Sequence, residues 1–167
     1  MALKKRLVTS RLPSVAAALL AGLALLGLPA CETGTPEQPA ISSSEIAVSV
    51  DPNPVVGSQN SATAAVTAKF DVKIQELNGL GCEVVFVNVA AFDKESGAQI
   101  ALVYYDGADL VVIVGSKRIE AQGTLVVPET VSYSLSDGRK EAIVTVAVQV
   151  RDDRGNLLNR SVMAQIQ

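Results

Sequence analysis

The side chains of this sequence that could do chemistry are two cysteines, seventeen carboxylates and three tyrosines, and none of its 167 residues is histidine. Histidine is the commonest general base, a common zinc ligand and the side chain that titrates near neutral pH. Its absence excludes a Ser–His–Asp or a Cys–His mechanism. We therefore expect a protein that is not an enzyme and that uses no cofactor.

Cys82 is the only cysteine outside the N-terminal region. No lysine or arginine lies near it in the sequence to lower the pKa of its thiol. The sequence therefore predicts a structural thiol at the start of a strand, with a reactive or intermolecular cysteine as the alternative.

Acidic and amide side chains gather in turns, where they could offer oxygen ligands to Ca²⁺. The clearest group is Asp152, Asp153 and Asn156, with Asp51 or Asp93 as further donors. No spacing matches an EF-hand loop, and Asp and Asn are common in hairpin turns for conformational reasons. We expect no metal site. A hydrolase with paired carboxylates stays as an alternative, although the acids lie mostly in separate turns.

Tyr104 and Tyr105 form the only local aromatic pair, close to the apolar run Leu110–Val114. If both lie in a strand, alternation turns one ring inward and the other toward solvent. Core packing by one ring is the simpler interpretation. A carbohydrate-binding or adhesive surface module that uses Tyr105 and nearby loops is the alternative.

The formal net charge is -3, but the basic residues are unevenly placed. Lys4, Lys5, Arg6 and Arg11 all precede the first acidic residue, Glu32. Without these four, ten basic residues remain beside seventeen acidic ones, a net charge of -7. Because an acidic surface repels the phosphate backbone, we expect no nucleic-acid partner.

The N-terminal region has the organisation of a secretion signal. The four basic residues precede the uncharged run Val15–Leu28, which is shorter than the ~20 apolar residues of a membrane-spanning helix. The run ends in Leu28-Pro29-Ala30-Cys31, which resembles the lipobox of bacterial lipoproteins. The resemblance covers the leader only and departs from the usual pattern at Pro29. An ordinary secretory signal cut near Ala30 is the alternative.

The resemblance implies that residues 1–30 are a lipoprotein signal peptide and that Cys31 carries the lipid. Two or three acyl chains anchor a protein stably, at ~0.8 kcal/mol per buried CH₂. The protein would then be held in the cell envelope through the lipid on Cys31. Glu32 favours the outer membrane in a diderm bacterium, facing the periplasm or the cell surface. Residues 31–44, rich in Pro, Thr and Ser, are predicted to be a flexible tether.

From residue 45 on, apolar and polar residues alternate with a period of two, which is typical of half-buried strands. The clearest cases are Ala64–Gln75 and Val144–Arg151. Four apolar side chains of these strands are expected to be buried: Phe70, Val72, Val146 and Val148. Four polar side chains of the same strands are expected to face solvent: Lys69, Lys73, Gln149 and Arg151.

Further strands are predicted at Ile46–Val50, Val84–Phe92, Ile100–Tyr105, Leu110–Val114, Lys117–Val127, Val131–Leu135 and Leu158–Ile166. Val84–Phe92 is apolar on both faces, so we expect it at the centre of a sheet and assign it no register. Pro128 is expected to separate two strands or to break a single one.

Seven to eight short strands with turn signals about ten residues apart favour an all-β fold, an antiparallel β-sandwich. The chain has no Trp, so its core must consist mainly of Val, Ala, Ile and Leu. The layout of residues 45–167, with a turn at Asp152–Asn156, resembles the immunoglobulin-like and fibronectin-type-III-like modules of bacterial surface proteins. That resemblance implies a non-catalytic module for protein interaction or envelope structure, with an envelope protein or a glycan as its partner.

Overall fold

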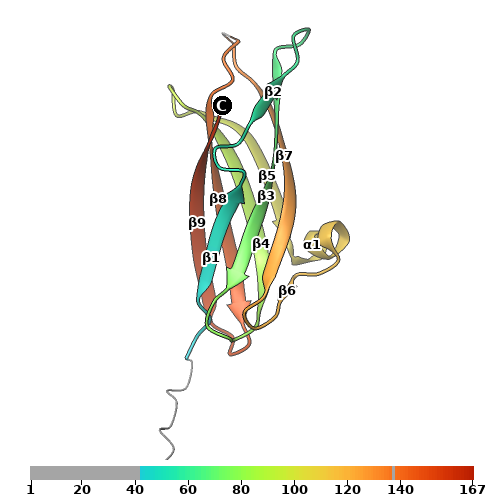
Figure 1. Cartoon of the computed structure of the whole chain (residues 1–167), viewed down its shortest axis with the longest axis vertical. Helices are drawn as coiled ribbons and strands as arrows, with labels where there is room; N and C mark the ends of the chain where they lie inside the picture. The colour runs from blue at the N-terminus through green and yellow to red at the C-terminus, as the bar shows by residue number, and fades with distance from the viewer. Residues whose placement is uncertain (1–41, 137) are drawn as a thin grey trace, which may run out of the picture. The chain divides into compact units, whose positions relative to one another are not determined.

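The computed structural model describes residues 42–136 and 138–167, which form two antiparallel sheets and one short helix (Figure 1). The predicted signal peptide (1–30), Cys31 and the predicted tether up to residue 41 lie outside the described residues. The strands are β1 (Ile46–Asp51), β2 (Gly57–Gln59), β3 (Ala65–Glu76), β4 (Cys82–Asp93), β5 (Gln99–Asp106), β6 (Arg118–Ile119), β7 (Thr124–Ser134), β8 (Ala142–Asp152) and β9 (Leu157–Ile166).

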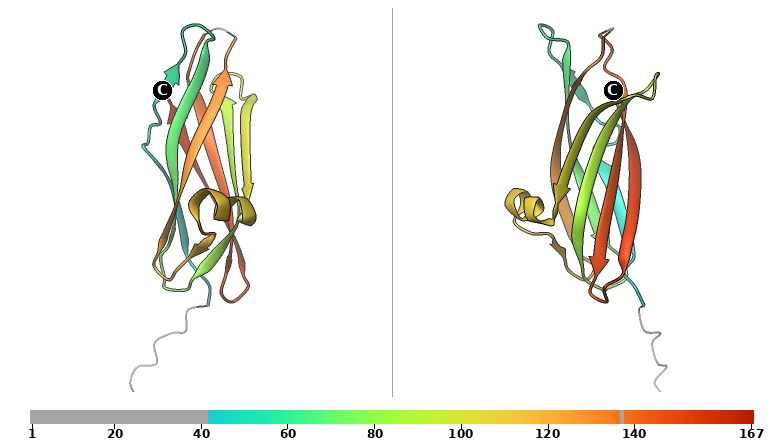
Figure 2. Two further views of the ribbon diagram at one scale, coloured as in Figure 1. Left: turned by 90° about the vertical axis from the view of Figure 1, so that its right-hand side faces the viewer. Right: turned by 180° about the vertical axis from the view of Figure 1, so that it is seen from behind.

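One sheet has four strands and the other has five (Figure 2). In the four-stranded sheet, β1 and β2 pair with successive parts of one edge of β3, and β7 pairs with its other edge. In the five-stranded sheet the order is β5-β4-β8-β9, and the two-residue β6 pairs with the beginning of β4. Two antiparallel sheets packed face to face form an immunoglobulin-like β-sandwich, so the predicted fold class is confirmed. Seven strands are long, and β2 and β6 are short additions.

The core lies between the sheets and is built from alternate residues of each strand. β7 shows this most strictly, because every second side chain from Leu125 to Tyr133 is buried. The four side chains predicted to be buried are all buried: Phe70, Val72, Val146 and Val148. Their polar neighbours lie on the outer faces, with Lys69 and Arg151 exposed and Lys73 and Gln149 half-buried. The predicted register of β3 and β8 is therefore confirmed.

β4 occupies the central position predicted for it, since β5 and β8 pair along its two edges. Its register shifts between Val84 and Phe86. The extra residue, Val85, forms a bulge, after which Phe86 lies on the outer face and Val87 in the core. This change of phase within one strand explains why its apolar sequence shows no single alternation.

The prediction of a strand at Leu110–Val114 is wrong, because this segment belongs to helix α1 (Gly107–Val114). The Asp106 carboxylate accepts hydrogen bonds from the backbone N–H groups of Ala108 and Asp109, at 2.7 and 3.0 Å, in a capping box. Gly115 ends the helix with a φ of 80°. A short apolar run does not distinguish helix from strand, whereas these two caps do. Within the described part of the chain, no helix is long and apolar enough to span a membrane.

β7 is one continuous strand through Pro128, and not two strands or a broken one. Pro128 faces outward opposite Asp71 of β3. In the described chain β3 is the only strand that pairs with β7, so β7 lies at an edge of its sheet. A proline is tolerated on an edge strand because its missing N–H need not interrupt a ladder.

Candidate functional site

Cys82 begins β4 and is completely buried. Burial, together with the nearby carboxylates of Glu76 and Asp153, raises the pKa of its thiol to about 11, against an opposing effect of Arg118. Such a thiol stays protonated at neutral pH, where the thiolate would be the nucleophile. The side chain is therefore built into the core as the sequence predicted for a structural thiol.

The Asp152 carboxylate is occupied by the turn that follows it. Its Oδ1 accepts hydrogen bonds from the backbone N–H groups of Arg154 and Asn156, at 3.0 and 2.8 Å. Its Oδ2 accepts from the Asn156 side-chain amide at 2.8 Å and from the backbone N–H of Ser44 at 3.2 Å. Burial opposes ionisation of Asp152, but these donors outweigh it and lower the pKa. The residue stabilises a turn, as turn chemistry predicted.

The other acids considered as calcium ligands lie elsewhere. Asp93 pairs with Ala142 at one end of β4, whereas Asp152 pairs with Cys82 at the other end. Asp51 forms an ion pair with Lys73 on the outer face of the four-stranded sheet. The described residues contain no group of three or more metal-ligating side chains close enough to hold an ion.

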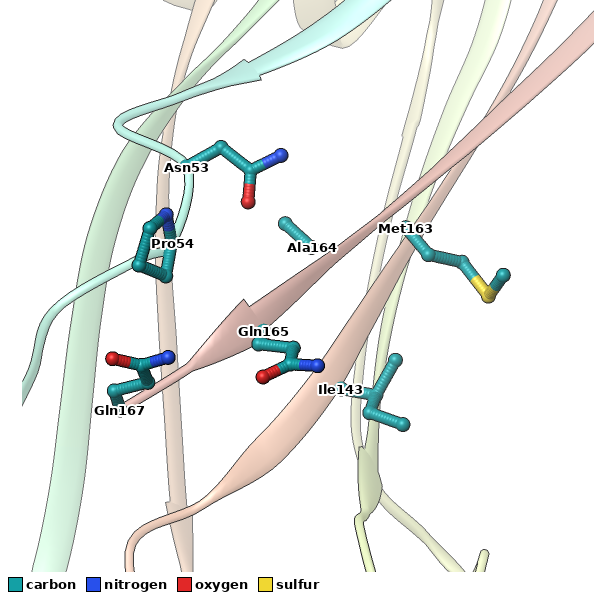
Figure 3. Close-up of a pocket in the computed structure, with 7 residues that line it drawn as sticks. All are labelled: Asn53, Pro54, Ile143, Met163, Ala164, Gln165 and Gln167. Atoms are coloured by element: carbon teal, nitrogen blue, oxygen red, sulfur yellow. The ribbon is translucent and has the colours of Figure 1, made fainter.

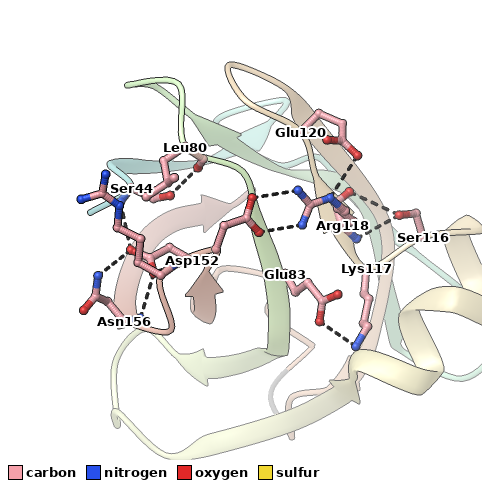
Figure 4. A network of polar contacts seen from close by, with 11 residues as sticks. Ser44, Leu80, Glu83, Ser116, Lys117, Arg118, Glu120, Asp152 and Asn156 are labelled. Carbon is pink, nitrogen blue, oxygen red and sulfur yellow. Dashed lines mark hydrogen bonds and ion pairs between the residues drawn. The ribbon is translucent and has the colours of Figure 1, made fainter. Parts of the chain in front are cut away.

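A polar network surrounds the Asp152 turn (Figure 4). Arg118 of β6 donates from Nη1 and Nη2 to the two carboxylate oxygens of Asp153, at 2.8 and 2.9 Å, and from Nε to Glu120 at 3.1 Å. Lys117 and Glu83 form a further ion pair at 2.8 Å. Because these groups satisfy one another, the network closes this end of the sandwich and leaves few free polar atoms for a ligand.

The chain enters the domain at this same end. Ser42, Ser43 and Ser44, which belong to the predicted tether, hydrogen-bond to the turns beside them. The Asn156 amide donates to the Ser42 carbonyl at 3.3 Å, and the Asn78 amide donates to the Ser43 carbonyl at 2.7 Å. Ser44 is buried. These contacts fix the end of the domain from which the N-terminal segment departs.

Glu129 is a buried carboxyl between the two sheets. It lies on the inner face of β7, and its side chain is 2% exposed. Oε2 accepts a hydrogen bond from the Tyr105 hydroxyl at 3.3 Å, while Oε1 is without a hydrogen-bond partner in the described structure. Burial raises the pKa of Glu129 to about 7, and the bond from Tyr105 opposes part of that rise. Glu129 is not among the site residues predicted from the sequence, although alternation between Val127 and Val131 places it inward.

The two tyrosines point to opposite sides of β5, as alternation predicts. Tyr105 is turned inward to Glu129, and Tyr104 is 56% exposed on the outer face. The carbohydrate-binding alternative named Tyr105, which is half-buried and packs against the core, whereas Tyr104 is the more exposed ring. Tyr104 stacks on Phe86 of β4, with ring centroids 5.9 Å apart and planes inclined by 28°. The pair forms an aromatic platform on the five-stranded sheet.

The middle of the outer face of the five-stranded sheet carries no charged residue, while Asp106 of β5, opposite Phe86, and the cross-strand pair Glu83 and Arg151 lie on the same face at one end. We call this surface the uncharged face and define it by the outward residues Phe86, Asn88, Ala90, Phe92, Leu102, Tyr104, Ile143, Thr145, Ala147, Gln149, Asn159, Ser161, Met163 and Gln165. The right-hand view of Figure 2 looks at the molecule from this side. Leu102 and Met163 are 55% and 68% exposed.

The outer face of the four-stranded sheet is different. Its outward residues include Asp51, Lys69, Asp71 and Lys73, with threonines and serines between them. Val126 is the large apolar side chain that it exposes. The two outer faces thus differ in where their charges lie, in the middle of the four-stranded sheet and at one end of the five-stranded sheet.

A depression of about 440 Å³ lies at the end of the uncharged face near β9 (Figure 3). Ile143, Met163 and Gln165 of that face line one side, and Asn53, Pro54 and Gln167 line the other, around Ala164. Its side chains are amides and apolar groups. The depression therefore extends the uncharged face without adding charge.

Helix α1 stands beside β5 and projects from the sandwich (Figures 1 and 2). Leu110 is its buried residue, while Val111, Val112 and Ile113 are 47%, 86% and 42% exposed. The caps at Asp106 and Gly115 hold this apolar turn in place. The exposed side chains of helix α1 form a second surface, smaller than the uncharged face.

Comparison with known proteins shows the fold alone. No protein family and no curated protein matches the sequence. The putative ApaA protein of Bordetella pertussis is 12% identical, with a TM-score of 0.54 over 72% of this chain and 93% of that one. The structural genomics target SoR45 is 14% identical, with a TM-score of 0.53 over 71% and 84% of the two chains. A CARDB domain from Pyrococcus furiosus, 13% identical over 75% and 89%, has a TM-score of only 0.40.

Proposed function

We propose that this chain is a lipid-anchored protein of the cell envelope, and that its β-sandwich is a non-catalytic module for protein interaction. The observation that carries the proposal is the uncharged face, with Leu102, Tyr104 and Met163 exposed on it. The cores of protein interfaces are poor in charge and rich in aromatic residues and Met.

The contrast between the two sheets supports this assignment. The outer face of the four-stranded sheet is hydrophilic because it carries Lys69, Asp71 and Lys73. The middle of the other outer face presents neutral side chains, with Asp106, Glu83 and Arg151 at one end of it, although about a quarter of the residues of an average protein are charged. A partner that covers the uncharged face would bury apolar area without desolvating any ion, which is the costly part of forming an interface.

Anchoring rests on the sequence Leu28-Pro29-Ala30-Cys31 and on the position of Ser44. A lipid on Cys31 would tether the sandwich by the end at which Ser44 is held. The uncharged face runs along the side of the sandwich, so a protein in the same membrane could reach it. Glu32 after the lipidated cysteine favours the outer membrane in a diderm bacterium.

Radiolabelled palmitate tests the anchor. Cells that express the full chain should label it, and the variant Cys31→Ala should carry no label and should leave the membrane fraction or remain unprocessed. A wild-type chain that takes up no palmitate would contradict lipid anchoring and would leave the secreted, unanchored alternative.

A pair of charge substitutions tests the interaction surface. Leu102→Asp places a carboxylate on the uncharged face, and Val126→Asp places one on the other outer face, where charges already stand. Envelope proteins cross-linked to the full chain should be lost with Leu102→Asp and retained with Val126→Asp. Equal retention by both variants would contradict the proposal.

The Tyr104–Phe86 platform favours one second candidate, binding of a neutral glycan. An exposed ring that lies on another ring offers a flat apolar surface, and Asn88, Gln149 and Ser161 nearby offer neutral hydrogen-bonding groups. Sedimentation of the full chain with insoluble chitin or cellulose tests it. Binding that is lost in Tyr104→Ala supports the glycan, and a chain that stays in the supernatant contradicts it.

A further inference from the structure

We infer that strand β5 and helix α1 together form a flap, residues 99–114, which opens from β7 when the buried carboxyl of Glu129 loses its proton. Opening of this β5–α1 segment needs no partner at the uncharged face, so it goes beyond the proposed function. Three features of the fold support it: the position of Glu129, the groups that surround it, and the slight burial of the segment.

Glu129 lies at the seam where β7, at an edge of one sheet, faces β5, at an edge of the other. It is 2% exposed, and its hydrogen bond across the seam is the one that Oε2 accepts from the Tyr105 hydroxyl at 3.3 Å. Oε1 has no hydrogen-bond partner in the described structure. A buried carboxylate needs several donors or water, whereas a neutral carboxyl does not. Ionisation therefore favours a state in which water reaches Glu129.

The groups around Glu129 do not compensate a negative charge. Phe70, its cross-strand partner on β3, is apolar, and the charged neighbours of Phe70 point to the outer face: Lys69 and Asp71. From β5 comes the Tyr105 hydroxyl, and the charged residue of α1 that acts on this hydroxyl is an acid, Asp109. No salt bridge to Glu129 is formed within the described chain. Burial accordingly raises the pKa of Glu129 to about 7.

The β5–α1 segment has little burial to lose when it opens. β5 is the one strand of the described chain without a buried residue, and its inward side chains Ala101, Val103 and Tyr105 are only half-buried. Across the seam, every inward side chain of β7 is buried. Helix α1 adds a single buried residue, Leu110. Few buried apolar contacts are typical of the parts of a protein that open locally.

The segment is also at the outside of the fold. In the described chain β5 pairs along one edge only, with β4. The left-hand view of Figure 2 shows α1 in front of the seam between β5 and β7. Release of the segment therefore leaves the ladders β3–β7 and β4–β8 in place. Because β5 carries Leu102 and Tyr104, each opening also displaces that part of the uncharged face.

Hydrogen exchange of the purified full chain in detergent tests the opening. After correction for intrinsic exchange rates, amides of residues 99–114 should lose about tenfold in protection between pH 6 and pH 8. The closed state holds the proton of Glu129 with a pKa of about 7, and in the open state the pKa returns to the ordinary 4.5. Protection of these amides that is the same at both pH values would overturn the inference.

A urea series distinguishes local opening from unfolding of the whole domain. At urea concentrations below the unfolding transition, exchange of residues 99–114 should not depend on urea, because local opening exposes little surface. Exchange in the centre of β8 should rise with urea, because those amides exchange through global unfolding. If residues 99–114 follow the same urea dependence as β8, the flap does not open by itself and the inference is overturned.

Two glutamine variants assign the pH dependence to one residue. Glu129→Gln cannot ionise, so protection of residues 99–114 should change less than about twofold between pH 6 and pH 8. Glu120→Gln, at a carboxylate whose side chain is 76% exposed, should keep the tenfold change of the wild type. A tenfold change that persists in Glu129→Gln would overturn the inference.

Tyr105→Phe keeps the test decisive if Glu129→Gln fails to fold by circular dichroism. The hydrogen bond from Tyr105 lowers the pKa of Glu129, so its removal should move the loss of protection to higher pH. A pH dependence of exchange that is identical in Tyr105→Phe and wild type would overturn the role of Glu129.

Discussion

The hydroxyl of Tyr105 donates a hydrogen bond to Glu129 Oε2 at 3.3 Å, across the space between the two sheets. It joins β5 of one sheet to β7 of the other at a position where neighbouring inward residues are apolar. The second carboxyl oxygen, Oε1, is buried without a partner in the described structure. Glu129 is therefore an internal carboxyl whose protonation changes near neutral pH.

Glu129 should make the domain more stable below neutral pH than above it. Burial raises the pKa of its carboxyl from 4.5 to about 7, so the folded state holds its proton over a range in which the unfolded chain releases it. The contribution of the protonated Glu129 carboxyl to the stability of the fold is fully present below pH 4.5 and is lost as the pH rises to 7. Glu129→Gln cannot ionise at this position. Its free energy of unfolding relative to that of the wild type, measured by urea melts, should rise by roughly 2–3 kcal/mol between pH 5 and pH 8.

Tyr105→Phe is the control for this pH dependence. The hydrogen bond from Tyr105 lowers the pKa of Glu129, so its removal should move the loss of stability to higher pH. If wild type and Glu129→Gln differ by the same amount at pH 5 and pH 8, Glu129 is not held in an apolar site.

Phe70 and Lys69 are neighbours on β3 with opposite surroundings. Phe70 is 4% exposed in the core and Lys69 faces solvent. Phe70→Ala should cost roughly 3–5 kcal/mol of unfolding free energy, because it leaves a cavity. Lys69→Ala should stay within about 0.5 kcal/mol. Urea denaturation of both variants measures the contrast, and equal costs would contradict the register of β3.

Asp106 is expected to set the start of helix α1. Removing its carboxylate in Asp106→Ala leaves the N–H groups of Ala108 and Asp109 without their acceptor. The free energy of unfolding should fall by about 1 kcal/mol, whereas Asp106→Asn should retain most of the stabilisation from the cap. Limited proteolysis within 107–115 reports the change locally, and an Ala variant as resistant as wild type would show that the cap is dispensable.

Counting thiols tests the two cysteines together. Cys82 is buried and its pKa is raised to about 11, so Ellman's reagent should not react with it in the folded protein. In denaturant the exported chain should release one thiol equivalent, because a lipid blocks the sulfur of Cys31. Two equivalents would show that Cys31 is free, and fast reaction in the native state would contradict the burial of Cys82.

Most of the fold could be predicted from the local alternation of apolar and polar residues along each strand. Phe70, Val72, Val146 and Val148 were assigned to the core from a period of two, which depends only on strand geometry. The period of two does not predict the structure where the backbone geometry departs from a regular strand. Val85 adds a bulged residue to β4, and the caps of α1 turn an apolar run into a helix. Pro128 remains within β7 because that strand lies at an edge, which one strand's sequence does not reveal.

The uncharged face could not be predicted in the same way. Its exposed residues Leu102 on β5 and Met163 on β9 are far apart in the sequence and lie on one surface only because the strand order is β5-β4-β8-β9. β8 also alternates in an ordinary manner, so the missing charge becomes apparent only when the outer sides of the four strands are seen together. Glu129 was detectable from alternation within β7, but its partner Tyr105 comes from the other sheet.

A photo-crosslinking amino acid placed on each outer face tests the central claim most directly. The probe would replace Leu102 on the uncharged face or Val126 on the opposite face, which are 55% and 41% exposed. After illumination of cells that express the full chain, we predict a discrete cross-linked protein from position 102 and none above background from position 126. Cross-links of equal yield at both positions, or only at 126, would contradict an interaction module that binds through the uncharged face.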